Sequence, residues 1–203
     1  MMKILAIVLS LSLYAAQDTP LQRLMKGNDR YVNNTPNPRE DSPKIRQSTT
    51  SKQTPFAIVV GCSDSRVPPE LVFDQNLGDL FVVRVAGNVV GPIEMETVVF
   101  ALDNLKTPLI VVLGHESCGA VKAILEGQAL EDDVADIAPL ILPAIRESKD
   151  LPGDPLVNAI EANVRNVIDV LKDNPKVKPY LKSGKLTIVG GYYHLDSGTV
   201  ELL

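Results

Sequence analysis

The sequence contains no tryptophan, and aromatic residues make up only 4% of it. Proteins that bind single-stranded nucleic acid stack bases on aromatic side chains, so such a platform is not expected. Positive charge is also in the minority: 20 Lys and Arg stand against 25 Asp and Glu, the net charge is -5, and no long basic run occurs. Binding to a phosphate backbone needs clustered positive charge. We therefore exclude nucleic acid as a partner and expect a small soluble substrate.

No internal repeat or low-complexity segment divides the 203 residues, of which 45% are hydrophobic. A chain of this length and composition can bury one substantial core. We expect a single domain over residues 17–203, preceded by a leader over residues 1–16.

The apolar run at the N-terminus is short. Lys3 precedes residues 4–13, which are apolar except for two serines, and Tyr14, Ala15 and Ala16 lead into polar sequence at Gln17. A basic start, a short apolar stretch and small residues are typical of a secretory signal peptide, and the run is too short to span a membrane comfortably. We predict cleavage near Ala16 and export to the periplasm, without a stable membrane span in the mature chain. The alternatives are an uncleaved leader that tethers the chain to a membrane, and a buried N-terminal helix.

Short apolar runs rich in Val and Ile mark the expected strands, at residues 56–60, 80–85, 109–113 and 186–189. Such runs are typical of parallel strands that are covered on both faces. Apolar residues have helical spacing at 21–32, 93–105, 118–125, 156–171 and, interrupted by proline, 134–145. Strands that alternate with helices predict an α/β fold, with a mostly parallel central sheet flanked by helices and an N-terminal helical arm. The polar, proline-containing stretch 33–54 is expected to be extended.

Two polar motifs directly follow the first and third expected strands: CSDSR at residues 62–66 and, after a glycine, HESCG at residues 115–119. Open α/β sheets bind ligands beyond the carboxyl ends of their strands, so both motifs are expected on one edge of the sheet. Together they hold three of the four Cys and His residues of the chain, namely Cys62, His115 and Cys118.

Two cysteines and one histidine form a catalytic zinc pattern, because three protein ligands leave the fourth tetrahedral position open. His115 and Cys118 lie at the entry to an expected helix, whose N-terminus favours the thiolate of Cys118. Zn²⁺ is therefore the expected cofactor. The simplest alternative in an exported chain is a disulfide between Cys62 and Cys118, the only two cysteines.

Asp64 and Arg66 lie on the same loop as Cys62. Arginine can hold a carboxylate with two hydrogen bonds and keep it ionised. An oriented carboxylate beside a metal site can accept a proton from water there, so this pair is a candidate catalytic dyad. An ordinary loop salt bridge is the alternative.

The two motifs, in this order, resemble the two signatures of the β-class carbonic anhydrases, and the resemblance extends over essentially the whole mature chain. It implies a zinc lyase, a carbonate dehydratase that reversibly hydrates carbon dioxide to bicarbonate and a proton. Its metal ligands match Cys62, His115 and Cys118. Asp64 and Arg66 fall on the family's catalytic dyad.

The resemblance also implies a substrate cleft. Gln53 matches a glutamine that forms hydrogen bonds in the cleft, Phe81 and Phe100 match apolar residues that line it, and the backbone amide of Gly119 faces the substrate oxygen. From the sequence alone, Gln53 is equally a solvated residue, and the two phenylalanines are equally ordinary core.

Some members of the family close the site by letting the aspartate bind zinc, with bicarbonate held between a Trp, an Arg and a Tyr. Arg84 and Tyr193 match two of these residues, but the Trp position falls at Val59. We therefore predict an open site without this bicarbonate switch. With His194 the only histidine outside the ligand set, no proton shuttle is evident.

The family further implies a homodimer or homotetramer in which the N-terminal arm embraces the neighbouring chain. Two other functions stay open. Carbonyl sulfide and carbon disulfide hydrolases share these motifs, because pocket access rather than the ligand set selects the substrate. A non-catalytic exported zinc-binding or disulfide-bonded protein is the other, and it predicts that Asp64→Ala leaves function intact.

Overall fold

The computed structural model describes residues 17–38, 43–127 and 135–203. The predicted signal peptide, residues 1–16, lies outside the described residues. Within the described ranges, no helix combines the length and the apolar character needed to cross a membrane.

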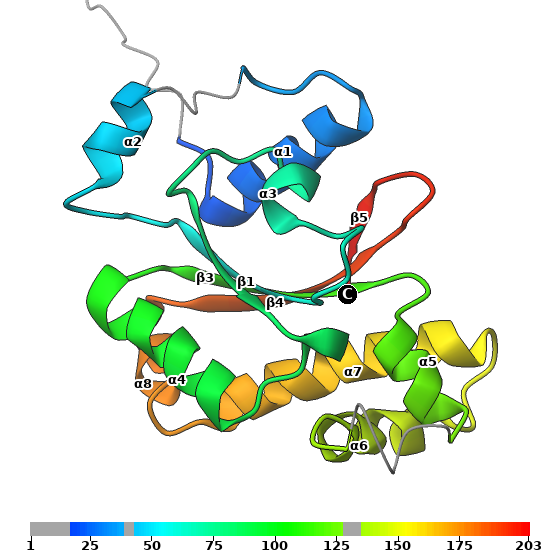
Figure 1. The fold of residues 1–203 in the computed structure, drawn as a ribbon. Coiled ribbons are helices and arrows are strands. Elements are labelled where there is room, and N and C mark those ends of the chain that lie inside the picture. The colour runs from blue at the N-terminus through cyan, green and yellow to red at the C-terminus, as the bar shows by residue number, and fades with distance from the viewer. Residues whose placement is uncertain (1–16, 39–42, 128–134) are drawn as a thin grey trace, which may run out of the picture.

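A single five-stranded sheet, in the order β2-β1-β3-β4-β5, forms the centre of the fold (Figure 1). Neighbours among β1 to β4 are parallel, and β5 runs antiparallel to β4 at the edge. The prediction of a mostly parallel sheet flanked by helices is confirmed. The strands are β1 (Ala57–Gly61), β2 (Leu80–Arg84), β3 (Leu109–His115), β4 (Thr187–Tyr193) and β5 (Val200–Leu202).

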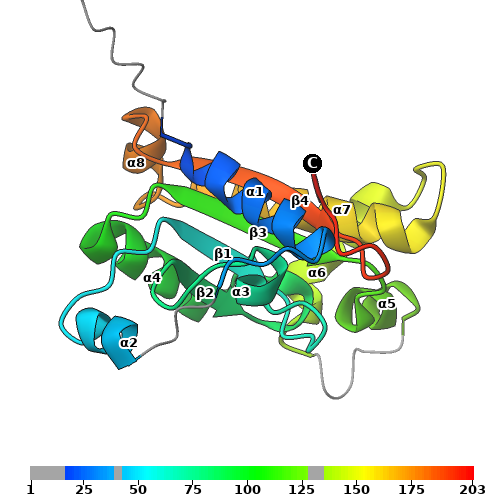
Figure 2. The same ribbon diagram turned by 90° about the horizontal axis from the view of Figure 1, so that it is seen from above.

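Helices cover both faces of the sheet (Figures 1 and 2). On one face lie α1 (Pro20–Val32), α2 (Pro43–Thr49) and α3 (Pro69–Val72). On the other lie α4 (Pro92–Phe100), continued by a π-helical turn η2 (Ala101–Leu105), then α5 (Gly119–Leu125), α6 (Ala138–Ser148), α7 (Pro155–Asp173) and α8 (Lys178–Lys182). A short 3-10 turn, η1 (Ala86–Asn88), follows β2.

Strands β1 and β3, in the interior of the sheet, explain why it needs covering on both sides. Every residue of β1 and β3 is buried. Side chains alternate along a strand, so Val59 packs in the cluster that contains Leu24 of α1, whereas Ile58 packs in the cluster that contains Val164 of α7. Burying one such side chain contributes about 1.5–3 kcal/mol, which fixes these strands in the interior.

The N-terminal region differs from the expectation in one respect: the stretch 33–54, expected to be extended, contains α2. The expected N-terminal helix is present as α1, and it packs on its own chain. Leu24 is fully buried, and the Asn28 side chain donates to the carbonyls of Val72 and Gly198 and accepts from the Val200 N–H. Local sequence could not show these contacts, because they join residues far apart in the chain.

Candidate metal centre

Three potential ligands converge at the carboxyl edge of the sheet. Cys62 follows β1, His115 ends β3, and Cys118 caps α5. Their ligand atoms all lie within 4.8 Å of one another, and all three residues are buried. Strand β1 lies between β2 and β3, and the chain runs from β1 to β2 on one side and later to β3 on the other. The carboxyl end of β1 is therefore the point where the strand order reverses, and open α/β sheets bind ligands at such a point.

The His115 ring is oriented as a metal ligand would be. Its Nδ1 lies 2.8 Å from the carbonyl oxygen of Glu116, which can only accept, so Nδ1 carries the proton and donates. Its Nε2 is fully buried and has no hydrogen-bond partner among the described residues. A buried polar atom without a partner is costly, and here its lone pair faces two cysteine sulfurs. The donor set therefore fits a metal ion, with the Glu116 carbonyl fixing the ring.

The two cysteines are free thiols, so the disulfide alternative is not the arrangement observed. The hydrogen bond from Cys118 is the main reason why the pKa of the Cys62 thiol is lowered to about 4, and the backbone N–H groups of Asp64 and Gly87 add to it against the effect of burial. The same hydrogen bond and burial raise the pKa of Cys118. A divalent cation bound here would favour the thiolate form of both cysteines.

Asp64 and Arg66 meet as the sequence predicted. Nε and a terminal nitrogen of Arg66 donate to the two carboxylate oxygens of Asp64 at 2.9 and 2.7 Å. The Arg66 hydrogen bond is the main reason why the pKa of Asp64 lies well below its usual value. Oδ2 of Asp64 is also 3.9 Å from Nε2 of His115. The dyad therefore presents an ionised carboxylate at the edge of the ligand set.

Sequence reasoning missed how the Cys62 loop is held. Arg84, on β2, donates from Nε to the carbonyl of Cys62 at 2.8 Å and from a terminal nitrogen to the carbonyl of Asp64. The backbone N–H groups of Asp64 and Gly87 each lie 3.4 Å from Sγ of Cys62. The guanidinium of Arg84 therefore holds the backbone of the loop that carries Cys62 and Asp64.

Comparison with known proteins agrees with this geometry. Residues 57–200 match the family model described as carbonic anhydrase. A carbonic anhydrase of Mycolicibacterium smegmatis is 42% identical, over 88% of this chain and 89% of the relative. Carbonic anhydrase 2 of Mycobacterium tuberculosis is 37% identical over the same shares. The solved structure of the β-carbonic anhydrase CcaA superposes with a TM-score of 0.73 at 27% identity, covering 90% of this chain and 94% of the other.

The chain belongs to the β-class carbonic anhydrases. The matched region contains both ligand loops and the dyad, but it begins after Gln53. A tetrameric β-carbonic anhydrase from the filamentous ascomycete Sordaria macrospora shares the fold, with a TM-score of 0.72 at 23% identity over 92% of this chain and 98% of that one.

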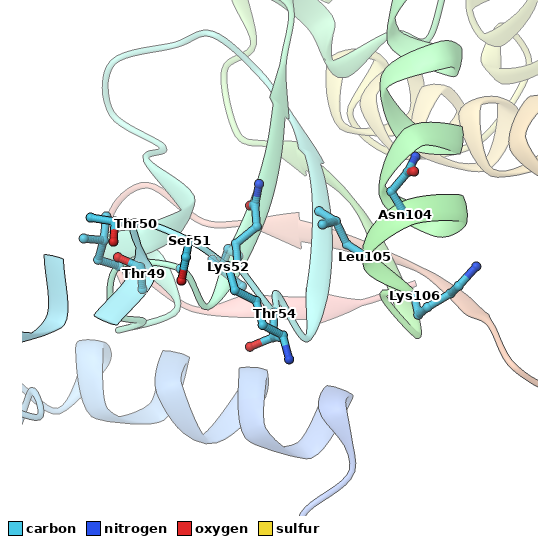
Figure 3. A pocket seen from close by; sticks show the side chains of 12 residues that line it. Thr49, Thr50, Ser51, Lys52, Thr54, Asn104, Leu105 and Lys106 are labelled. Carbon is cyan, nitrogen blue, oxygen red and sulfur yellow. The ribbon is translucent and has the colours of Figure 1, made fainter. Parts of the chain in front are cut away.

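The residues expected in the substrate cleft of a β-carbonic anhydrase do not all meet within one chain. Gly119 is next to Cys118 and starts α5. Gln53 precedes β1, at the end opposite to Cys62, and lines a surface pocket with residues of the segment after α2 and of the η2 end (Figure 3). Phe81 lies on β2 and stacks on Phe100 of α4, with ring centroids 6.4 Å apart. Within this chain, Gly119 is thus next to a candidate ligand, whereas Gln53 lies at the opposite end of β1.

Proposed function

We propose that the chain reversibly hydrates carbon dioxide to bicarbonate and a proton at a zinc ion held by Cys62, His115 and Cys118. The observation that carries this proposal is the convergence, in a chain of the carbonic anhydrase family, of two buried sulfurs and of Nε2 of His115, which has no hydrogen-bond partner in the described part of the chain. Three protein ligands suit a catalytic rather than a structural zinc site.

When bound, zinc acts as a Lewis acid that makes water nucleophilic near neutral pH. The chain supplies the rest. Asp64, kept ionised and oriented by Arg66, accepts a hydrogen bond from water at the site and orients it, and Arg84 holds the loop that carries both Asp64 and Cys62. Burial of all three ligand residues excludes bulk water from the sulfurs and strengthens each electrostatic contact.

The test combines zinc analysis with stopped-flow hydration of carbon dioxide. The wild type should contain one zinc per chain and hydrate carbon dioxide. Cys118→Ser should lose most of the metal, and Asp64→Ala should keep the metal but lose most of the rate. Asp18→Ala is a matched control, because it removes an exposed carboxylate paired with Lys26 far from the ligands in sequence. Wild-type protein with zinc but without hydration activity would refute the proposal.

Hydrolysis of carbonyl sulfide or carbon disulfide has no specific support, since the named relatives are carbonic anhydrases. A sulfide-release assay on the same protein separates these reactions. A non-catalytic protein would keep its function when the Asp64 carboxylate is removed. The Asp64→Ala variant therefore separates this alternative from the proposed enzyme.

We also propose that the chain works as a homodimer or homotetramer. Three large apolar side chains are well exposed near β2 and α4: Leu77 at 55%, Ile93 at 76% and Phe100 at 51%. A second copy that covers these side chains would bring its Gln53 to the ligands of the first copy. Sedimentation analysis should find a dimer or a tetramer, and Ile93→Asp should weaken it. A fully active wild-type monomer would contradict the proposal.

Export remains a proposal that rests on the pattern of residues 1–16 alone. Expression of the full chain in a bacterium, followed by fractionation and N-terminal sequencing, should place the protein in the periplasm with a new N-terminus near Gln17. An intact N-terminus in the membrane fraction would favour the uncleaved leader, and a cytoplasmic intact chain would refute export.

A further inference from the structure

A buried asparagine lies behind the Cys62 ligand. Asn163, on the sheet-facing side of α7, has no exposed surface and sits in a buried run with Ile160, Val164 and Val167. Its Nδ2 donates to the carbonyl oxygen of Gly87 at 2.8 Å, while its Oδ1 has no partner among the described residues. An apolar residue would fill this position without leaving a buried oxygen unsatisfied, so packing alone does not account for an asparagine.

Gly87 connects this asparagine to the metal centre. Its carbonyl accepts from Asn163, and its own N–H points at Sγ of Cys62 at 3.4 Å. Gly87 has φ +70°, and the next residue, Asn88, has φ +46°, so two successive residues of the η1 turn are left-handed. Glycine adopts this conformation freely, whereas at Asn88 it costs energy and persists because surrounding contacts determine it. A Cβ on Gly87 would lie 2.7 Å from Cδ1 of Ile141, so the turn is also tightly enclosed.

We propose that Asn163 is a positioning residue for the metal ligand Cys62, acting through the backbone of Gly87, whose carbonyl and N–H belong to the two peptide groups that meet at its Cα. By holding the Gly87 carbonyl, the carboxamide orients the turn so that the Gly87 N–H donates to the Cys62 sulfur. An N–H bond to a thiolate fixes the direction of its lone pairs and lowers the charge that it gives the metal. This inference rests on the proposed function only in taking Cys62 as a zinc ligand.

The test uses the full-length zinc-loaded protein and its cobalt(II)-substituted form. Asn163→Leu removes the donor and keeps a side chain of similar size. Asn166→Leu is the matched control, since Asn166, on the same helix, donates from Nδ2 to a backbone carbonyl at 3.1 Å, but that carbonyl belongs to Leu140 of α6. We expect Asn163→Leu to release zinc to a chromophoric chelator about tenfold faster than wild type. It should also shift the thiolate-to-cobalt charge-transfer band, whereas Asn166→Leu changes neither.

A general loss of stability is separated from positioning by Leu171→Ala, which removes a buried side chain near the far end of α7. This variant should unfold more easily but keep the wild-type zinc release rate and cobalt band. If Asn163→Leu does not fold, Asn163→Ala removes the same donor with a smaller side chain. The proposal would be overturned if the folded Asn163 variant released zinc at the wild-type rate and kept the wild-type cobalt band. It would also be overturned if Leu171→Ala changed both measurements as much as the Asn163 variant does. Wild-type protein that holds no zinc would instead refute the proposed function itself.

Discussion

Replacing Arg66 by glutamine is expected to move Asp64 onto the metal. The Arg66 side chain supplies two hydrogen bonds to the carboxylate, and its backbone N–H supplies a third, to Oδ1 at 2.9 Å. The substitution removes the two side-chain bonds and leaves the backbone bond in place. The oxygen released is therefore Oδ2, the atom that already lies 3.9 Å from Nε2 of His115.

The required movement is small. Ligand atoms around a tetrahedral zinc, at bond lengths of about 2.0–2.2 Å, lie about 3.3–3.6 Å from one another. Oδ2 of Asp64 thus needs to come only about 0.3–0.6 Å nearer to Nε2 of His115 to reach the distance between two ligands of one metal. A carboxylate in the fourth position closes the site that the reaction needs open. Because misplacing a reacting group by such distances can cost about a hundredfold, we expect kcat/KM for carbon dioxide hydration to fall by about that factor.

The assay is stopped-flow hydration together with the absorption spectrum of the cobalt(II)-substituted protein, which reports a change in the fourth ligand. Arg165→Gln is the control, because it breaks an exposed pair with Glu161 at 2.6 Å, in the middle of α7. The control should keep the wild-type rate and spectrum. If Arg66→Gln lost activity with an unchanged cobalt spectrum, the arginine would serve catalysis without restraining Asp64, and the geometric reasoning would be wrong.

Two further predictions concern stability. Gly27→Ala would place a Cβ 1.8 Å from the carbonyl oxygen of Phe73, and overpacking against backbone should lower the free energy of unfolding in urea by about 3 kcal/mol. Gly119→Ala, whose Cβ would meet nothing within 4 Å, should stay within about 0.5 kcal/mol of wild type, and equal effects of the two would contradict the packing argument. Free zinc at 100 times its Kd should stabilise the chelator-stripped protein by about 2.7 kcal/mol, measured as a rise in Tm. Cys118→Ser should show no such rise, and a rise as large as that of wild type would exclude Cys118 as a ligand.

Much of the fold, and the convergence of the three candidate ligands, could be predicted because both follow from local pattern. Continuous Val and Ile runs mark β1 and β3, and the residue types that bind metal come directly after them. The rule that parallel strands end at one edge then brings Cys62 and His115 together without any knowledge of packing. Asp64 and Arg66 were equally accessible to sequence reasoning, because their interaction is contained in one loop.

What could not be predicted depends on contacts to backbone groups across long separations in the chain. Arg84 reaches the carbonyl of Cys62 from a neighbouring strand, and Asn163 reaches the carbonyl of Gly87 from α7, a helix much later in the chain. A carbonyl acceptor leaves no signal in the amino-acid sequence, since every residue has one. The position of Gln53 is a different case, because the described chain places it at the end of β1 opposite to Cys62, and only the proposed oligomer would bring it to a set of ligands.

The two halves of the ligand set are held by different parts of the sheet, and this links metal binding to folding. The Cys62 loop is held by Arg84 of β2 and by the η1 turn. The other half is held by Glu116. The carbonyl of Glu116 orients the His115 ring. The N–H of Glu116 donates to the carbonyl of Tyr193, and its carboxylate accepts from the Leu195 N–H. The affinity for the proposed zinc ion should therefore depend on the register of β2, β1, β3 and β4 together. Local opening of either edge would separate Cys62 from His115 and release the ion, and a bound ion would in turn oppose that opening.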